Sequence, residues 1–163
     1  MAKKLILWVL VIVCMATIFC FSAQEANDSG RVSEGFTYNI IKFFDFNDTI
    51  TDERAMEIAD NMDGFIRKLA HFCIYALLGF LIALLLNEYR YNYSKVISGA
   101  VSISFLYSCT DEFHQYFVPG RSGQVSDVAL DTFGALCGAV FAVIIIVLIR
   151  KHKENTPPKA GWL

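Results

Sequence analysis

Long apolar stretches constrain the fold of this chain more than any other feature of its sequence. Three of them run from Leu5 to Ser22, from Leu69 to Asn87 and from Val128 to Ile149. Each approaches or meets the roughly 20 residues that cross a hydrocarbon layer about 30 Å thick. A fourth, Val96 to Thr110, is uncharged but rich in serine, and reaches spanning length only with its flanking residues. We therefore predict an all-α integral membrane protein with four transmembrane helices (5–22, 69–87, 96–112, 128–149). For residues 96–112, a buried helix that does not span the membrane is the alternative.

The composition agrees with a single membrane domain. The chain has 163 residues, of which 55% are hydrophobic, and a mean hydropathy of +0.46, so it is too short for two domains and too apolar for an ordinary soluble one. A net charge of -2 provides no basic field for nucleic acid, which is not an expected partner. Five cysteines lie in apolar stretches and predict packed thiols rather than disulfides: Cys14, Cys20, Cys73, Cys109 and Cys137.

The positions of lysine and arginine predict the orientation, because these residues in short flanks resist translocation. Three regions rich in them are expected in the cytoplasm, and their basic residues are Lys3, Lys4, Arg90, Lys95, Arg150, Lys151, Lys153 and Lys159. The segment from Ala23 to Lys68 has ten acidic and five basic residues, and the connection from Asp111 to Ser126 has only Arg121. Both segments are expected outside, with both termini inside.

The two ends of the chain have their own predictions. The N-terminal stretch resembles a secretory signal peptide, but its apolar core is longer than usual, so we expect a retained anchor, with cleavage as the alternative. Residues 1–150 are assigned to the membrane domain and residues 151–163 to a cytoplasmic tail. The last dozen residues contain Pro157 and Pro158 and are expected to be disordered.

The first extracytoplasmic segment is predicted to contain two amphipathic helices. The first follows Ser33 as a cap and has apolar residues at helical spacing, namely Phe36, Ile40, Phe43 and Phe44; it is expected on the membrane surface. The second begins at Thr51, followed by Asp52 and Glu53, which favour a helix N-terminus. This second helix is expected to continue through Gly64 into the next transmembrane helix.

Ionisable residues at membrane depth are costly and usually face a cavity or one another. In this chain they gather at the predicted outer ends of three transmembrane helices: Arg67, Lys68, His71 and Tyr75; Asp111, Glu112, His114 and Gln115; and Asp127 and Asp131. Spacings of three and four residues place three sets on shared helix faces: Arg67, His71 and Tyr75; Asp111, His114 and Gln115; and Asp127 with Asp131. Ser22 and Gln24 could join them. We predict that these groups form one site at the outer side of the membrane.

Three interpretations of this site stay open. In the structural one, Arg67, Lys68 and Arg121 neutralise the carboxylates. In the catalytic one, His71, Asp111, Glu112 and His114 supply general acids and bases, because histidine titrates near neutral pH. The remaining residues then bind a lipid-borne headgroup and its phosphate, namely Arg67, Lys68, Tyr75, Gln115, Arg121, Asp127 and Asp131. In the third, a divalent metal is held by a set drawn from Asp111, Glu112, His114, Asp127 and Asp131.

Proline and glycine predict two further features. The sequence Pro119-Gly120-Arg121-Ser122-Gly123 allows a tight turn that could fold Arg121 back over the carboxylates. Gly79, and Gly134 with Gly138 at the spacing of a close-packing motif, predict small-residue faces where transmembrane helices approach one another.

These motifs together resemble the VanZ-like family of small bacterial membrane proteins, named for a glycopeptide (teicoplanin) resistance protein. The resemblance covers about Leu5 to Ile149 and is carried by Phe21-Ser22-Ala23-Gln24, Arg67-Lys68-Leu69-Ala70-His71-Phe72, Asp111-Glu112-Phe113-His114-Gln115, Pro119-Gly120-Arg121 and Asp127 to Asp131. Ala23 departs from the serine or aspartate usual in the first motif. The resemblance implies a protein of the bacterial cytoplasmic membrane, associated with the cell envelope and in some members with reduced glycopeptide susceptibility, but it supplies no settled reaction.

Two hypotheses about the function therefore stay open. The first is an outer-leaflet site that binds or modifies an anionic envelope lipid or cell-wall precursor. The second is a non-enzymatic membrane scaffold or interaction protein whose charged cluster is structural. A transporter is a weaker third function, because the polar groups lie near one end of the helices rather than at the membrane midplane.

Overall fold

A computed structural model describes residues 1–24, 26–45, 49–121 and 123–155. These residues form five α-helices and no strand: α1 (Ala2–Ser22), α2 (Ala26–Phe44), α3 (Asp52–Asn87), α4 (Tyr93–Gln115) and α5 (Val125–Asn155). The prediction of an all-α fold is confirmed. Three helices, α1, α3 and α5, are long and apolar enough to cross a membrane. They contain the three strongest apolar stretches of the sequence.

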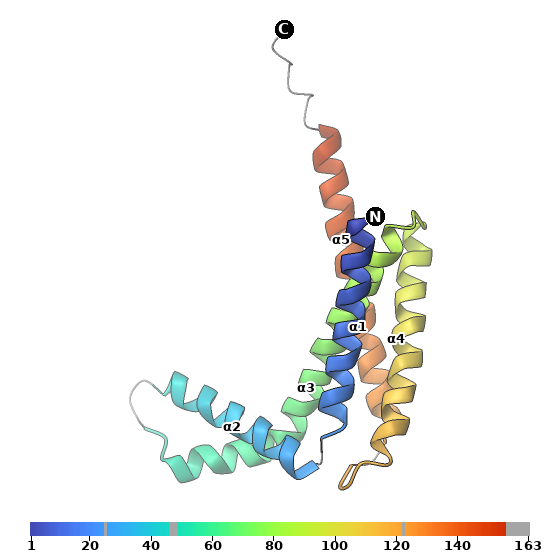
Figure 1. Ribbon diagram of the computed structural model, residues 1–163. Helices are drawn as coiled ribbons and strands as arrows, with labels where there is room; N and C mark the ends of the chain where they lie inside the picture. The colour runs from blue at the N-terminus through green and yellow to red at the C-terminus, as the bar shows by residue number, and fades with distance from the viewer. Residues whose placement is uncertain (25, 46–48, 122, 156–163) are drawn as a thin grey trace.

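The helices form a bundle with an arm at one end (Figure 1). The bundle consists of α1, α4, α5 and the C-terminal part of α3, which run side by side. The arm consists of α2 and the N-terminal part of α3, which pack against each other and project sideways. The N-terminus and the described end of α5 lie at the end of the bundle that is far from the arm. We call these the terminal end and the arm end.

Helix α3 begins where its sequence predicts and continues from the arm into the bundle. The side chain of Thr51 accepts a hydrogen bond from Arg54 N at 3.3 Å, and Asp52 and Glu53 occupy the first turn, where carboxylates favour the helix dipole. The helix is unbroken through Gly64 as far as Asn87. It therefore connects the arm directly to the membrane-spanning bundle.

Two expectations for helix boundaries are wrong. Ser33 does not cap α2, because that helix begins at Ala26. Its hydroxyl instead donates to Gly30 O at 3.0 Å and to the Asp63 carboxylate on α3, which is how serine is satisfied inside a helix. The predicted disordered tail is helical as far as Asn155, because α5 extends beyond its apolar stretch. Pro157, Pro158 and Lys159, like Ser122 of the predicted turn, lie outside the described residues.

Small residues bring α3 and α5 into close contact, as predicted. A Cβ atom on Gly138 would lie 1.8 Å from Ala76 O, and one on Gly79 would lie 2.2 Å from Ala135 O. No side chain fits at such distances, so the two backbones touch. This contact fixes the relative position of the helices that carry His71 and Asp131.

Helix α4 is weakly hydropathic because its buried face is polar. The buried side chains on this face include Ser104, Ser108, Asp111, Glu112 and Gln115. The exposed side chains include Ile103, Phe105, Leu106 and Phe113. At 23 residues, the helix is about 34 Å long. The polar groups of this buried face point toward the other helices, whereas the outward surface carries these apolar side chains together with Lys95, Ser98 and Thr110.

Candidate functional site

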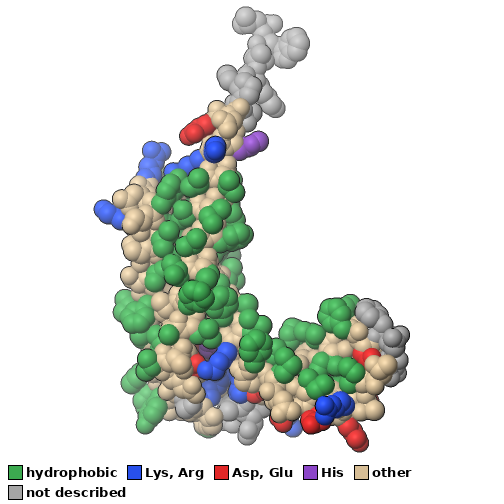
Figure 2. Space-filling model, turned by 180° about the vertical axis from the view of Figure 1, so that it is seen from behind, with side chains coloured by type: hydrophobic (Ala, Val, Ile, Leu, Met, Phe, Trp, Pro, Cys, Tyr) green, Lys and Arg blue, Asp and Glu red, His purple; other side chains and the backbone are tan. Residues whose placement is uncertain are grey.

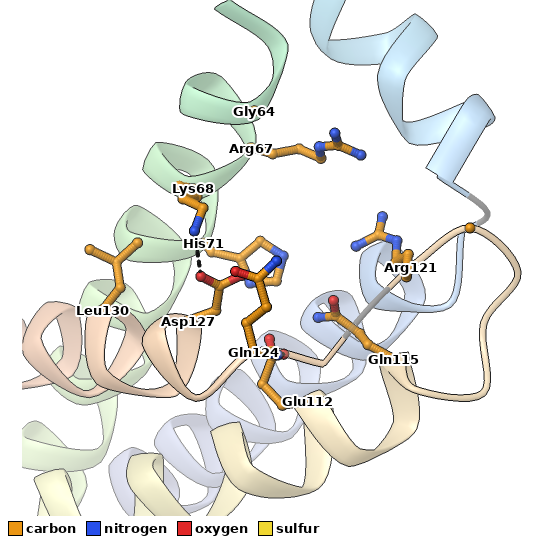
Figure 3. Close-up of a pocket in the computed structure, with 11 residues that line it drawn as sticks. Gly64, Arg67, Lys68, His71, Glu112, Gln115, Arg121, Gln124, Asp127 and Leu130 are labelled. Atoms are coloured by element: carbon orange, nitrogen blue, oxygen red, sulfur yellow. Dashed lines mark hydrogen bonds and ion pairs between the residues drawn. The ribbon is translucent and has the colours of Figure 1, made fainter.

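A cavity of about 250 Å³ lies at the arm end of the bundle, where α3, α4, α5 and the connection between α4 and α5 meet (Figure 3). Most of its lining is polar or charged: Gly64, Arg67, Lys68, His71, Glu112, Gln115, Gly120, Arg121, Gln124, Asp127 and Leu130. They come from two parts of the sequence, residues 64–71 of α3 and residues 112–130, which include the end of α4, the connection and the start of α5. The polar groups at the ends of three separate helices therefore share one cavity, which we call the polar cavity.

Two of its cations, both on α3, are paired with carboxylates. Arg67 donates to Asp63 one turn earlier at 2.5 Å, and Lys68 forms an ion pair with Asp127 of α5 at 2.7 Å (Figure 3). The Lys68 side chain is 48% exposed, so solvent screens this pair and its contribution to stability is small. The pair nevertheless links α3 to the start of α5 across the mouth of the cavity.

The third cation, Arg121, has no carboxylate partner among the described residues. Its Nε donates to Gln24 O at 2.9 Å, and a terminal nitrogen donates to Phe21 O at 3.3 Å. Arg121 thus lines the same cavity as Glu112 and Asp127, but its hydrogen bonds are to carbonyl oxygens at the C-terminal end of α1 and just after it. The turn that brings it there contains Gly120 with φ of 74°, a conformation that glycine adopts without strain.

Arg121 and Arg67 face the same space from different elements (Figure 3). Burial, and next the positive charge of Arg67, lower the pKa of the Arg121 guanidinium, which stays charged because arginine does not deprotonate in proteins. Two guanidinium groups held close together repel each other. An anion between them would relieve this repulsion, and the planar fork of arginine suits carboxylates and phosphates.

A histidine lines the polar cavity, and a fully buried carboxylate lies behind it. Asp131 has no exposed surface, and its Oδ1 lies 3.8 Å from His71 Nδ1. Its other oxygen accepts a hydrogen bond from Ser108 Oγ at 2.9 Å. The Tyr75 ring stacks on the other side, with 6.4 Å between ring centroids. This arrangement holds the imidazole of His71 at the cavity, where it could accept or donate a proton.

Two further carboxylates come from the end of α4. Glu112 lines the cavity and accepts a hydrogen bond from Gln124 N at 2.9 Å. Asp111 lies behind it and accepts one from Gln115 Nε2 at 3.3 Å. One oxygen of each of Asp111, Glu112 and Asp131 is buried without a hydrogen-bond partner among the described residues. Such groups are few in native proteins, where strain, a catalytic role, or a bound water or ion accounts for them.

The structure brings most of the predicted site residues together. Those that line the polar cavity are Arg67, Lys68, His71, Glu112, Gln115, Arg121 and Asp127. Asp111, Asp131 and Tyr75 lie behind this lining and are buried. Ser22 is buried near Asp111, and Gln24 contributes only its carbonyl oxygen to Arg121. The chemical roles of these residues stay predictions.

His114 does not belong to the cavity. Its ring packs against Phe19 of α1, with 4.6 Å between ring centroids. The reason is helix geometry, because two residues turn a helix by about 200° and so place His114 opposite Glu112. The described residues contain no group of three or more His, Cys, Asp or Glu positioned to hold a metal ion, and the metal interpretation stays a prediction.

Two residues of the site were missed in the sequence. Ser108 lies one turn before Asp111 and Glu112 on the buried face of α4, so extending the polar stripe backward by one turn would have found it. Gln124 lies in the connection before α5 and binds Glu112 through its backbone. No sequence pattern marks Gln124, because its position depends on how the connection packs onto α4.

The fold and the cavity define a multi-pass helical membrane protein with a charged cavity at one end of its bundle. The sequence profile of the VanZ/LLP1 family matches residues 7–147, and the chain belongs to this family. The resemblance in the motifs is thereby confirmed. No curated protein and no solved structure matches the chain.

Proposed function

We propose that this protein binds the anionic headgroup of an envelope lipid or cell-wall precursor in the polar cavity. The observation that carries the proposal is the pair of arginines, Arg67 and Arg121, which face one cavity although Arg121 has no carboxylate partner among the described residues. A bound phosphate or carboxylate would accept hydrogen bonds from both guanidinium groups. Lys68 lines the same cavity and would add a third positive charge.

The cavity then faces the outside of the bacterial cytoplasmic membrane. In this topology four helices, α1, α3, α4 and α5, cross the membrane. The inclusion of α4 is supported by its packing against α3 and α5 and by its apolar exposed side chains. Lys3, Lys95 and Arg150 lie in or beside helix ends at the terminal end of the bundle, as expected for the cytoplasmic side.

The arm then lies on the outer membrane surface. Figure 2 shows hydrophobic side chains that continue from the bundle along the upper side of the arm, while charged side chains gather mostly along its lower edge. Val32, Phe36 and Phe43 are all more than half exposed on α2. An apolar side of this kind is typical of helices that lie in the interface with the polar face toward water.

Modification of the bound headgroup is the catalytic form of the same proposal. His71 would act as the general base or acid, and Asp131 would orient it, because their side chains face each other at 3.8 Å. A second candidate is a structural scaffold. It is favoured by Arg121, whose hydrogen bonds to Phe21 O and Gln24 O tie the α4–α5 connection to α1.

Neutralising variants separate a binding site from a scaffold. Arg121→Gln and Asp111→Asn would be compared with the unaltered protein for abundance in the membrane and for the change in glycopeptide (teicoplanin) susceptibility that expression causes in a bacterial host. We expect both variants to accumulate normally but to lose the effect on susceptibility. Arg121→Lys keeps the charge but not the planar fork, and is expected to keep only part of the effect.

Arg54→Gln is the matched control, because Arg54 lies on the exposed surface of the arm and, among the described residues, its guanidinium pairs with Glu57 at 2.7 Å. It should keep both abundance and effect. Loss of Arg121→Gln and Asp111→Asn from the membrane, with Arg54→Gln unaffected, would favour the scaffold. Normal abundance with a full effect on susceptibility would contradict the proposed binding site.

A further inference from the structure

A second cavity, of about 450 Å³, lies beside the polar cavity between α1, α2 and α3. We call it the apolar groove. Its lining includes Ile18 and Phe21 of α1, Val32 and Phe36 of α2, and Leu69 and Ala70 of α3. Its volume lies within the range of roughly 300–1,000 Å³ that small-molecule sites usually occupy. The groove is therefore large enough to hold part of a ligand.

The groove and the polar cavity share three residues. Arg67, His71 and Arg121 line both of them. The two guanidinium groups thus stand at the junction, with an apolar surface on one side and a polar, charged one on the other. A molecule that fits both spaces must carry an anionic group at the point where a hydrocarbon part begins.

We infer that the ligand of this protein is a phosphate-bearing lipid whose phosphate lies between Arg67 and Arg121 and whose hydrocarbon chain lies in the apolar groove. This inference rests on the proposed function and names the class of its ligand. A membrane phospholipid has both features in the required order. A free phosphate or a soluble precursor would occupy the polar cavity and leave the groove without an apolar occupant.

The surroundings of the groove favour entry from the bilayer. Leu69, Ala70 and Cys73 on α3 are exposed on the outside of the bundle, where the lipid chains would lie. Helix α2 forms the opposite wall with Val32 and Phe36, which are 63% and 57% exposed. Covering these side chains with a hydrocarbon chain removes apolar surface from the interface, which is favourable in proportion to the area covered.

Native mass spectrometry of the purified, detergent-solubilised protein would test the inference by titration with defined molecules. The probes are phosphatidylglycerol, phosphatidylcholine with the same chains, and glycerol 3-phosphate, which has the phosphate but no chain. We expect phosphatidylglycerol to bind at least about tenfold more tightly than either of the others. Glycerol 3-phosphate has no chain for the apolar groove, and the headgroup of phosphatidylcholine brings a positive charge into the polar cavity. Equal binding of glycerol 3-phosphate would overturn the inference of a lipid.

Two variants distinguish failure of the inference from failure of the proposed function. Ala70→Trp fills the groove and should weaken phosphatidylglycerol at least about tenfold, whereas Leu77→Trp, on the same helix but outside the groove, should not. The double variant Arg67→Gln/Arg121→Gln should weaken it at least as much. Unchanged binding by Ala70→Trp alone would overturn the inference and leave the proposed function standing. Unchanged binding by the arginine variant would overturn both.

A second measurement does not depend on the folding of any variant. Phosphatidylglycerol with a photoreactive group in its chain would be crosslinked to the unaltered protein in membranes, and the modified peptides identified by mass spectrometry. We expect crosslinks in the segments that line the groove, around Phe36 and Cys73. Crosslinks confined to the outer face of α5, around Phe141, which is 58% exposed, would show only surrounding lipid and would contradict the inference.

Discussion

The two ends of the bundle both carry charged residues, but they hold them in different ways. At the terminal end, Lys3 forms an ion pair with Glu88, and its side chain is 74% exposed. Arg150 donates to Asn87 Oδ1 at 2.8 Å and to Tyr93 Oη at 3.0 Å, also at the surface. At the arm end, by contrast, Asp111, Glu112 and Asp131 are only 3%, 6% and 0% exposed.

The two ends differ in whether their charged groups are exposed to solvent or buried. Exposed ion pairs cost little and contribute little, so charges like those of the terminal end suffice where helices leave a membrane. Buried carboxylates are costly unless they are paired and hydrogen-bonded, and each of the three at the arm end has an oxygen without a hydrogen-bond partner among the described residues. The arm end therefore carries more polarity than the boundary needs, as expected for a binding site.

The largest effect is expected from a substitution that disrupts the contact between α3 and α5, the two helices that run between the two ends of the bundle. Gly138→Leu would force a side chain into the α3–α5 contact, where a Cβ atom alone would lie 1.8 Å from the backbone oxygen of Ala76. Because a backbone atom cannot move aside like a side chain, we expect destabilisation at or above about 3 kcal/mol, the upper part of the range for overpacked cores. Thermal unfolding in detergent and abundance in the membrane would measure it.

Gly35→Leu is the matched control, because Gly35 lies on exposed α2 and a Cβ atom there meets nothing within 4 Å. We expect it to unfold like the unaltered protein, or slightly later because glycine disfavours helices. Equal stability of Gly138→Leu and Gly35→Leu would contradict the close contact between α3 and α5. The two ends would then not be held in a fixed relation.

A smaller effect on stability is expected from replacing a buried serine of α4 than from Gly138→Leu, and an exposed serine of the same helix serves for comparison. Ser108 donates to the fully buried Asp131 at 2.9 Å, whereas Ser98 is exposed and donates to Lys95 O at 3.4 Å. Ser108→Ala removes a partner from a buried carboxylate and should cost about 1–3 kcal/mol. Ser98→Ala should change the free energy of unfolding by less than about 0.5 kcal/mol.

Chemical unfolding of the two serine variants in the same detergent would give these values. A similar, small effect of both would mean that Asp131 is satisfied without Ser108. At this position, the buried polar groups of the arm end would then contribute no more to stability than the exposed groups of the terminal end. A loss confined to Ser108→Ala would sharpen that contrast.

The fold was predictable where the signal is periodic and local. The apolar stretches predicted α1, α3 and α5, and Thr51 marked the start of α3, because hydropathy and capping act over a few residues. The start of α2 was missed because no strong cap precedes Ala26. The extension of α5 to Asn155 was missed because its last turns are polar.

The site was predictable as a gathering of charges but not as a set of contacts. The expected equal depth of three helix ends was enough to predict that His71, Glu112 and Asp127 lie at one cavity. That His114 points away from Glu112 follows from their spacing of two residues on one helix. The contact of His114 with Phe19 and the pairing of Arg121 with carbonyl oxygens depend instead on the tertiary packing of α1, about which sequence spacing contains no information.

The smallest expected effect concerns an exposed carboxylate outside the bundle, beside the connection from α2 to α3. Asp45 accepts hydrogen bonds from Ile50 N at 2.7 Å and from Thr49 N at 2.9 Å, and these bonds, that of Ile50 first, lower its pKa from 3.8. A lowered pKa in the folded state means that its stabilising contribution is present above pH 3.8 and is lost as the pH falls through the lowered value. We expect this loss to be local, because the group is exposed.

Nuclear magnetic resonance of the isotope-labelled protein in detergent would follow the amide signals of Thr49 and Ile50 between about pH 6 and about pH 3. They should shift together with a midpoint below 3.8, while global unfolding stays unchanged over most of that range. Asp45→Asn should abolish the shift at every pH. A midpoint at or above 3.8 would mean that the two backbone hydrogen bonds do not hold the ionised carboxylate. A global transition at the same midpoint would mean that even an exposed carboxylate supports the whole fold, and burial would then no longer distinguish the carboxylates of the arm end from charges elsewhere in the molecule.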